Sequence, residues 1–258
     1  MKSKLETHIR TLREQRDLLF MSHCVLGYKS KEDNFALVQA LVDANVEIIE
    51  LQIPFSEPIA DGPTLIKANH DAVASGISTD ECFALAGEIS KRHPETAFII
   101  MTYFNVVYCR GVQQFMQDAH DAGILGVIVP DLPIEEADEL LNAARETGVA
   151  AVLLVTPASS EERLATIAQQ AMGLVYCVAR KGVTGHQTLF SEEFDRYLAR
   201  VKEKTSLPLG VGFGVKTAED LQHLVGRADV AIVCSQIIEA YATKGPEAAR
   251  MLVQELRK

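Results

Sequence analysis

Short runs of β-branched and apolar residues recur along the whole chain, separated by segments whose apolar residues follow helical spacing. Eight of these runs have the length and residue types of buried strands. The predicted strands are residues 19–26, 46–53, 97–103, 123–129, 149–155, 174–179, 207–213 and 229–234. Between them, apolar residues three and four positions apart predict helices. The predicted helices are residues 111–122, 135–147, 161–172, 192–201 and 218–225.

This alternation of strands and helices implies βαβ units and a parallel sheet. The chain has 258 residues, close to the roughly 250 typical of a barrel of eight strands and eight helices. A doubly wound open sheet is the structural rival, but no glycine-rich turn follows the first predicted strand. We therefore predict an α/β fold, a single (β/α)8 TIM-barrel domain over residues 1–258. An extra N-terminal helix within residues 1–16 is expected to cap the bottom of the barrel.

The composition argues against several classes of binding partner and cellular location for this protein. Lys and Arg number 25 against 35 Asp and Glu, a formal charge of −10, which argues against non-specific binding of nucleic acid. The five cysteines are scattered without a CxxC pair, as expected for reduced thiols in a cytoplasmic protein without a metal-finger site. The first residues lack the apolar segment of a signal peptide, and no apolar run is long enough to span a membrane. We expect a cytoplasmic protein that has no metal and contacts neither nucleic acid nor membrane.

The second predicted strand carries a carboxylate on its inner face. Side chains alternate between the faces of a strand, so Ile49 and Leu51 face the helices while Glu50 points into the barrel. The active site of a TIM barrel lies at the carboxyl ends of its strands. A carboxylate buried there is suited to general acid–base chemistry, and we assign that role to Glu50. A structural glutamate bound to the backbone is the alternative. Glu47, at the strand's start, is expected to form a surface ion pair.

The segment from residue 54 to 79 is too long for a simple βα loop and should carry function. Its Asp61-Gly62 turn signal places Asp61 over the barrel mouth, within reach of Glu50. Two carboxylates in one mouth can divide roles, one titrating and one staying ionised. The alternative for Asp61 is capping of a helix at residues 64–75.

The run from Glu50 to Pro63, ELQIPFSEPIADGP, is similar to the signature of tryptophan synthase α subunits. The similarity extends over nearly the whole chain. It includes the segments YFN at 103–105, PDLP at 130–133, RKGVTG at 180–185 and GFG at 212–214. The resemblance implies retro-aldol cleavage of indole-3-glycerol phosphate to indole and glyceraldehyde 3-phosphate, in tryptophan biosynthesis. It implies that Glu50 is the general acid–base and that Asp61 holds the indole N–H.

The resemblance also implies a third catalytic residue and a phosphate site. Tyr176, inward by alternation with Leu174 and Val178, would support the catalytic carboxylate; an ordinary core tyrosine is the alternative. Barrel enzymes often bind phosphate with the loops after strands seven and eight, and we add the loop at 182–190, expected to be a mobile lid. The residues expected to bind substrate or its phosphate are Tyr103, Thr184, Gly185, Gly212, Phe213, Gly214, Cys234 and Ser235. For Ser235, capping of the following helix is the alternative.

No cofactor is expected in this chain. The family partner is the β subunit, which uses pyridoxal phosphate and receives indole through a tunnel. Exposed residues near the catalytic carboxylates are expected to dock it. They are Pro54, Phe55, Glu57, Pro58, Asn105 and Pro133.

Four positions depart from the family pattern: His23, Gln52, Glu57 and Cys234. His23 stands where an aromatic wall of the indole pocket is expected, and we expect it to be a packed, neutral core histidine. Gln52 and Cys234 replace a usual glycine, and Glu57 a usual aspartate.

Three other functions stay open. The chain could be a non-catalytic regulator that binds a phosphate ligand, although the presence of Glu50 and Asp61 disfavours this. It could be a Schiff-base aldolase with Lys181 as nucleophile, although Lys181 falls in a loop. It could also be a free-standing lyase that releases indole without a partner.

Overall fold

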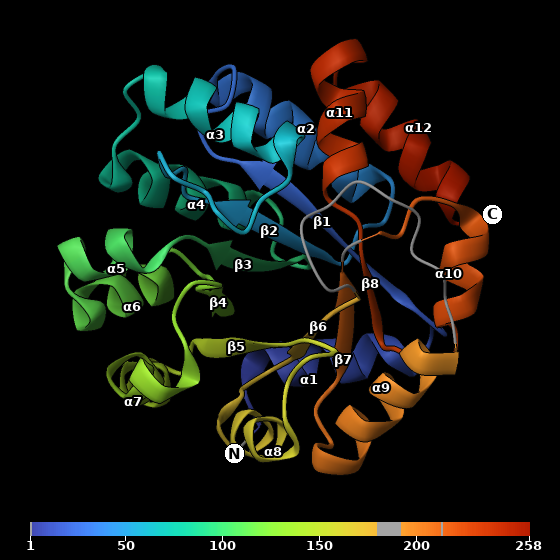
Figure 1. The fold of residues 1–258 in the computed structure, drawn as a ribbon. Coiled ribbons are helices and arrows are strands. Elements are labelled where there is room, and N and C mark those ends of the chain that lie inside the picture. Colours follow the sequence, from blue (N-terminus) through green and yellow to red (C-terminus); the bar gives the residue numbers. More distant parts are fainter. Residues whose placement is uncertain (1, 180–191, 213) are drawn as a thin grey trace.

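A computed structural model describes residues 2–179, 192–212 and 214–258. Eight parallel strands pair in sequence order and close into a barrel surrounded by helices (Figure 1). The strands are β1 (Leu19–Val25), β2 (Ile48–Gln52), β3 (Ala97–Met101), β4 (Gly126–Ile128), β5 (Ala150–Val155), β6 (Val175–Val178), β7 (Leu209–Gly212) and β8 (Val230–Ile232). The pairing of β1 with β8 closes the sheet. The predicted TIM barrel is therefore confirmed, and the open sheet is excluded.

Helices follow the strands around the outside of the barrel (Figure 1). They are α1 (Lys4–Arg13), α2 (Lys31–Asp43), α3 (Pro63–Ala74), α4 (Thr79–Arg92), α5 (Phe104–Arg110), α6 (Val112–Asp121), α7 (Asp138–Thr147), α8 (Glu161–Gln170), α9 (Glu192–Lys204), α10 (Ala218–Leu224), α11 (Ser235–Lys244) and α12 (Pro246–Leu256), with a 3-10 turn at Ile134–Glu136. The predicted helices are all present with shifted ends. Four further helices, α2, α4, α5 and α12, were not assigned from the sequence. Within the described residues, no helix is both long and apolar enough to cross a membrane.

The long segment after β2 resolves into a ten-residue loop, the extra helix α3 and the start of α4. Helix α4 begins with a capping box, in which Ser78 and Glu81 each bond the other's backbone N–H. Helix α3 begins after Gly62 without a side-chain cap. Asp61 therefore does not cap this helix, and the capping alternative for Asp61 is wrong.

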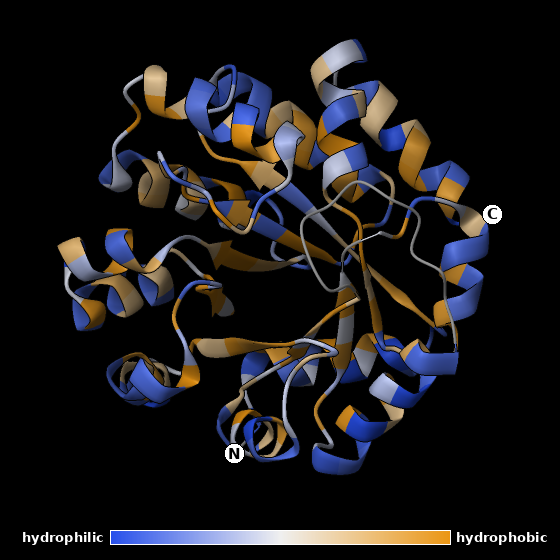
Figure 2. Cartoon of the chain, viewed as in Figure 1, coloured by the Kyte–Doolittle hydropathy of each residue, from blue (hydrophilic) through white to orange (hydrophobic). Residues whose placement is uncertain are grey.

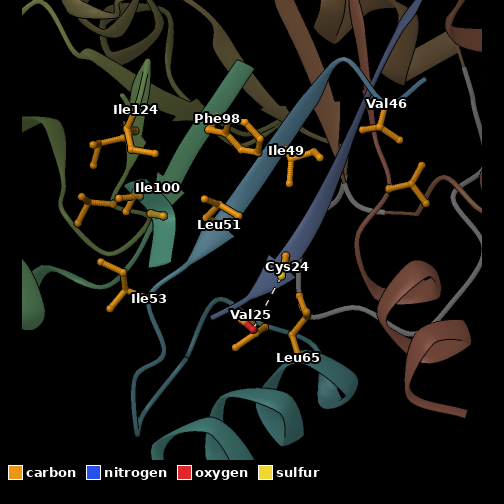
Figure 3. Close-up of a cluster of buried hydrophobic side chains, with 14 of the residues drawn as sticks. Cys24, Val25, Val46, Ile49, Leu51, Ile53, Leu65, Phe98, Ile100 and Ile124 are labelled. Carbon is orange, nitrogen blue, oxygen red and sulfur yellow. Dashed lines mark hydrogen bonds between the residues drawn. The ribbon is translucent and has the colours of Figure 1, made fainter. Parts of the chain in front are cut away.

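Alternation along the strands divides the apolar core in two. Ile49 and Leu51 of β2, and Ile53 directly after it, belong to the cluster between the barrel and its helices, and Figure 3 shows them among neighbours from the adjoining strands. Ile48 belongs to a second cluster inside the barrel. The helices present apolar residues towards the strands and polar residues outwards (Figure 2). The predicted orientation of β2 is confirmed, and it aims Glu50 into the barrel.

Helix α1 closes the bottom of the barrel, as predicted. Its side chains Leu5 and Ile9 are fully buried in the inner cluster. Beside it, Glu47 is only 6% exposed. Glu47 accepts hydrogen bonds from Arg16, Arg257 and the backbone N–H of Phe20. The ion pair predicted for Glu47 is present, but its predicted surface location was wrong, because two arginines from opposite ends of the chain cover this carboxylate.

Candidate active site

The top of the barrel holds a cavity of about 350 Å3. Residues from the carboxyl ends of the strands and from the loop after β2 line it. The lining residues that carry a charged or titratable side chain are His23, Glu50, Asp61, Tyr176, Lys216, Cys234 and Glu239. Both predicted catalytic carboxylates therefore open onto one enclosed space, large enough for a small organic molecule.

His23 and Glu50 occupy paired register positions on β1 and β2. The Nδ1 atom of His23 lies 2.9 Å from Oε1 of Glu50. Both side chains are buried, with 1% and 5% of their surface exposed. The Glu50 carboxylate therefore has a titratable side chain as its partner, unlike a structural glutamate that bonds only to the backbone.

A chain of amide side chains joins this pair to Asp61. The Nε2 atom of His23 lies 2.9 Å from Oε1 of Gln52. Gln52 donates through its Nε2 to Asp61 over 2.8 Å. Asn69 of α3 donates to the same Gln52 Oε1 over 3.0 Å. Gln52 and Asn69 are fully buried, so the amide links between His23 and Asp61 are shielded from water.

Tyr103 holds the loop that carries Asp61. Its hydroxyl donates to Asp61 over 3.0 Å and accepts from the backbone N–H of Ala60 over 3.1 Å. Tyr103 is fully buried and is not among the described residues that line the cavity. The substrate contact predicted for Tyr103 therefore stays a prediction, and what the structure shows is a hydroxyl that holds the Asp61 carboxylate.

The electrostatics of the site follow from this packing. Burial raises the pKa of Asp61, against the lowering effects of His23, Gln52 and Tyr103. Burial alone would lower the pKa of His23. The hydrogen bonds with Cys234 and Glu50 and the charge of Glu50 outweigh that effect, so the His23 pKa lies well above its ordinary value. His23 is packed in the core, as expected, but the carboxylate of Glu50 on the next strand favours its charged form over the neutral form that was expected.

Tyr176 faces the cavity from β6, as alternation predicted, and belongs to the inner cluster. Burial, then the nearby Cys234 and Glu50, raise the pKa of its phenol well above the ordinary value, so Tyr176 stays a neutral hydrogen-bonding group. Gly212 at the end of β7 packs against this ring. A Cβ at Gly212 would lie only 2.6 Å from Cζ of Tyr176. The described lining of the cavity includes Gly214 but not Gly212.

The amino end of α11 also lines the cavity. Cys234, Ser235 and Gln236 line the cavity there, next to Gly214 and Lys216 of the loop after β7. Cys234 occupies the capping position, but its side chain makes no capping hydrogen bond, and Ser235 is the first residue of the helix. The capping alternative for Ser235 is therefore wrong. The first N–H groups of such a helix suit an anion.

Some predicted residues fall outside the described part of the chain. They are Thr184, Gly185, Phe213 and Lys181. Two relevant side chains were not predicted at all, Asn69 and Lys216. Lys216 is exposed and lines the cavity together with Gly214, Cys234 and Ser235. In the described ranges, no group of three or more His, Cys, Asp or Glu could hold a metal ion.

The surface beside the site differs from expectation at two prolines. Pro54 and Pro58 are buried, because the loop after β2 folds down over the barrel. Phe55 is half-buried and its ring stacks on Tyr103, with centroids 5.3 Å apart. Glu57, Asn105 and Pro133 are exposed as predicted. Ile59 is exposed over 76% of its surface and Tyr108 over 70%.

Comparisons with known proteins identify the family of this chain. The family model described as tryptophan synthase alpha chain matches residues 9–258. The tryptophan synthase alpha chain of Syntrophotalea carbinolica is 44% identical over 253 residues, which are 98% of this chain and 100% of the relative. That of Desulfotalea psychrophila is 43% identical over 253 residues, 98% and 99% of the two chains.

Solved structures give the same result. A chain of Mycobacterium tuberculosis tryptophan synthase superposes with a TM-score of 0.92 and 33% identity, covering 99% of this chain and 97% of that one. A chain from a structure described as the tryptophan synthase α2β2 complex of Pyrococcus furiosus superposes with a TM-score of 0.84 and 33% identity. The match covers 93% of this chain and 96% of that one. With the matched family model and these relatives, the chain belongs to the tryptophan synthase alpha chain family.

Proposed function

We propose that this chain cleaves indole-3-glycerol phosphate to indole and glyceraldehyde 3-phosphate, as the α subunit of tryptophan synthase in L-tryptophan biosynthesis. One observation carries the proposal. Glu50 and Asp61 are both buried and open onto one cavity that the amino end of helix α11 also lines. This arrangement offers proton transfer, charge stabilisation and anion binding within one enclosed space.

The reaction needs two proton transfers. Glu50 gives a proton to indole C3, which leaves a cationic indolenine. Asp61, as a carboxylate, accepts the hydrogen bond of the indole N–H and stabilises that charge. Glu50 then takes the proton of the hydroxyl next to the breaking bond. A carbonyl forms, the C–C bond breaks, and its electron pair returns to the ring to give indole. Tyr176 is proposed to hold Glu50 in place during both transfers.

The phosphate of the substrate is proposed to lie at the amino end of α11. Gly214, Cys234 and Ser235 supply backbone there, and Lys216 adds a positive charge. We retain Gly212, Thr184, Gly185 and Phe213 as proposed members of this phosphate site. For Gly212 the role is indirect, since the ring of Tyr176 occupies the space beside it.

We further propose a β subunit as partner, since a solved relative is described as an α2β2 complex. The docking surface would comprise the exposed Glu57, Ile59, Asn105 and Pro133 with the half-buried Phe55. Pyridoxal phosphate is expected in the β subunit, and no cofactor in this chain. A cytoplasmic location and one catalytic domain over residues 1–258 complete the proposal.

The test is an assay that measures both products from indole-3-glycerol phosphate, with and without the β subunit. We expect indole and glyceraldehyde 3-phosphate in equal amounts, and faster release with the β subunit present. Fast release that the β subunit does not change would favour the free-standing lyase. Substrate binding without either product would favour the non-catalytic regulator and overturn the proposal. Inactivation by borohydride in the presence of substrate would favour the Schiff-base aldolase.

A further inference from the structure

We propose that His23 is a positioning residue of the lyase reaction, holding against Glu50 the proton that this carboxylate exchanges with substrate. The catalytic part of this inference rests on the proposed function. The geometric part rests on the hydrogen bonds that join Asn69, Gln52, His23 and Glu50. Backbone groups next to Asn69 fix which atom donates in these bonds.

The network is anchored at Asn69. The backbone N–H of Phe55 can only donate, so the Asn69 atom 3.0 Å from it must be the amide oxygen. The backbone carbonyl of Leu65 can only accept, so the Asn69 atom 2.9 Å from it must be the amide nitrogen. The orientation of this side chain is thereby settled by its neighbours. Asn69 must therefore donate to Gln52 over 3.0 Å.

The orientation of Gln52 follows from that of Asn69. Its atom facing the Asn69 nitrogen must be the oxygen, because a flipped Gln52 would set two N–H groups against each other. Its nitrogen then donates to Asp61 over 2.8 Å, as an ionised carboxylate requires. The same Gln52 oxygen lies 2.9 Å from Nε2 of His23. Two acceptors do not approach so closely, so Nε2 of His23 must carry a hydrogen.

This leaves one proton to place between Nδ1 of His23 and Oε1 of Glu50, which lie 2.9 Å apart. With the proton on Nδ1, the pair is an imidazolium beside a carboxylate, and Glu50 can act as a base. With the proton on Oε1, the pair is a neutral imidazole beside a carboxylic acid, and Glu50 can act as an acid. The pair therefore carries both forms that the reaction needs, without exchange of a proton with water.

Other groups face the pair from the elements packed around it. Asp61 approaches from the loop after β2, Cys234 from the end of β8, and Tyr176 from β6. Burial raises the pKa of Cys234 and of Tyr176, so both stay neutral. The carboxylates of Glu50 and Asp61 are the negative charges, and the elevated pKa of His23 fits its role as their counter-charge.

The pair can be tested without turnover, by nitrogen-15 NMR of the histidine side chains in the full chain. The signal of His23 is assigned by its loss in His23→Phe. We expect both His23 nitrogens to be protonated at pH 7, and to remain so above the ordinary histidine range. In Glu50→Gln we expect a neutral His23 with its hydrogen on Nε2. A His23 that titrates near the ordinary value of 6.5, or carries its hydrogen on Nδ1, would overturn the inference.

The role in the reaction is tested by the pH profile of indole release in His23→Phe and His23→Gln. Gln keeps hydrogen-bonding capacity but cannot carry the extra proton. We expect both variants to lose roughly ten-fold or more in kcat, with KM changed by less than about three-fold. The acid limb of indole release should move to higher pH in both variants, because no imidazolium at position 23 then favours the ionised form of Glu50. His120→Gln, on the exposed end of α6, is the control that should match wild type.

The outcomes separate the two claims. A wild-type profile in His23→Gln would mean that hydrogen bonding alone suffices, and would overturn the proton-holding role. An inactive wild-type chain with the predicted NMR signals would contradict the proposed function while leaving the proton-sharing pair intact.

Discussion

Tyr103 donates a 3.0 Å hydrogen bond to Asp61 and accepts a 3.1 Å hydrogen bond from the backbone N–H of Ala60. One phenol therefore fixes both the catalytic carboxylate and the loop that carries it. The loop has further support from Phe55, which stacks on the same ring.

Tyr103→Phe removes this bond and keeps the ring. The pKa of Asp61 is already raised, first by burial, and the bond from Tyr103 opposes that rise. Without this hydrogen bond the pKa of Asp61 should rise further, so Asp61 becomes protonated at a higher pH than in the wild type. We expect the acid limb of indole release to move upward and kcat at pH 7 to fall by roughly ten-fold. Tyr108→Phe, on an exposed ring, is the control. An unchanged acid limb in Tyr103→Phe would contradict the role.

Gly212→Ala should disturb Tyr176, since the added Cβ would lie 2.6 Å from Cζ of the ring. Overpacking of this kind costs about 1–3 kcal/mol. Indole release should fall as well, because the ring must move within the cavity. The matched control is Gly87→Ala in α4, where the added Cβ finds its nearest neighbour at 3.7 Å. That change should be neutral or stabilise by up to about 1 kcal/mol. Urea unfolding measures both, and equal stabilities would contradict the packing argument.

Glu47→Ala should destabilise the fold without touching the chemistry. It leaves the buried N–H of Phe20 without its acceptor, and two arginines lose their carboxylate. We expect a loss of about 1–3 kcal/mol in the free energy of unfolding. Glu88→Ala, which breaks an exposed pair with Arg92, should cost no more than about 0.5 kcal/mol. If both variants unfold at the same urea concentration, the contacts of Glu47 with Arg16 and Arg257 do not stabilise the fold more than an exposed ion pair does.

The barrel and the inward aim of Glu50 were predictable from the sequence, because strand alternation and the βα rhythm are local patterns. The same alternation puts His23 inside the barrel, on the strand next to Glu50. The hydrogen proposed on Nε2 of that histidine was not predictable, because it follows from the orientation of Gln52, which Asn69 fixes, and the position of Asn69 is set by the path of the loop before α3. The burial of Glu47 likewise depends on Arg16 and Arg257, which meet only in the folded chain.

The burial of Pro54 and Pro58 was also not predictable from the sequence. Prolines in a loop indicate a stiff segment, and the sequence does not say towards which side that segment folds. The stacking of Phe55 on Tyr103 draws the loop onto the barrel. Ser56, Glu57 and Ile59 remain exposed on its outer side.

Glu57→Lys should weaken the complex with the β subunit by roughly three- to ten-fold, as reversal of an exposed charge at an interface edge does. Since the same loop carries Asp61, the activation of indole release by the β subunit should fall in parallel. The control is Glu14→Lys, on the exposed carboxyl end of α1 at the bottom of the barrel. Titration calorimetry gives both affinities. Equal affinities for the two variants would place the docking surface elsewhere.

The central claim is that Glu50 transfers the protons in cleavage of indole-3-glycerol phosphate. The measurement that tests it most directly is indole release by Glu50→Gln under single-turnover conditions, with the β subunit present and correct folding verified by circular dichroism. Gln keeps the shape of the side chain but cannot exchange a proton. The account predicts a fall of about two orders of magnitude or more, and release at near the wild-type rate would contradict it.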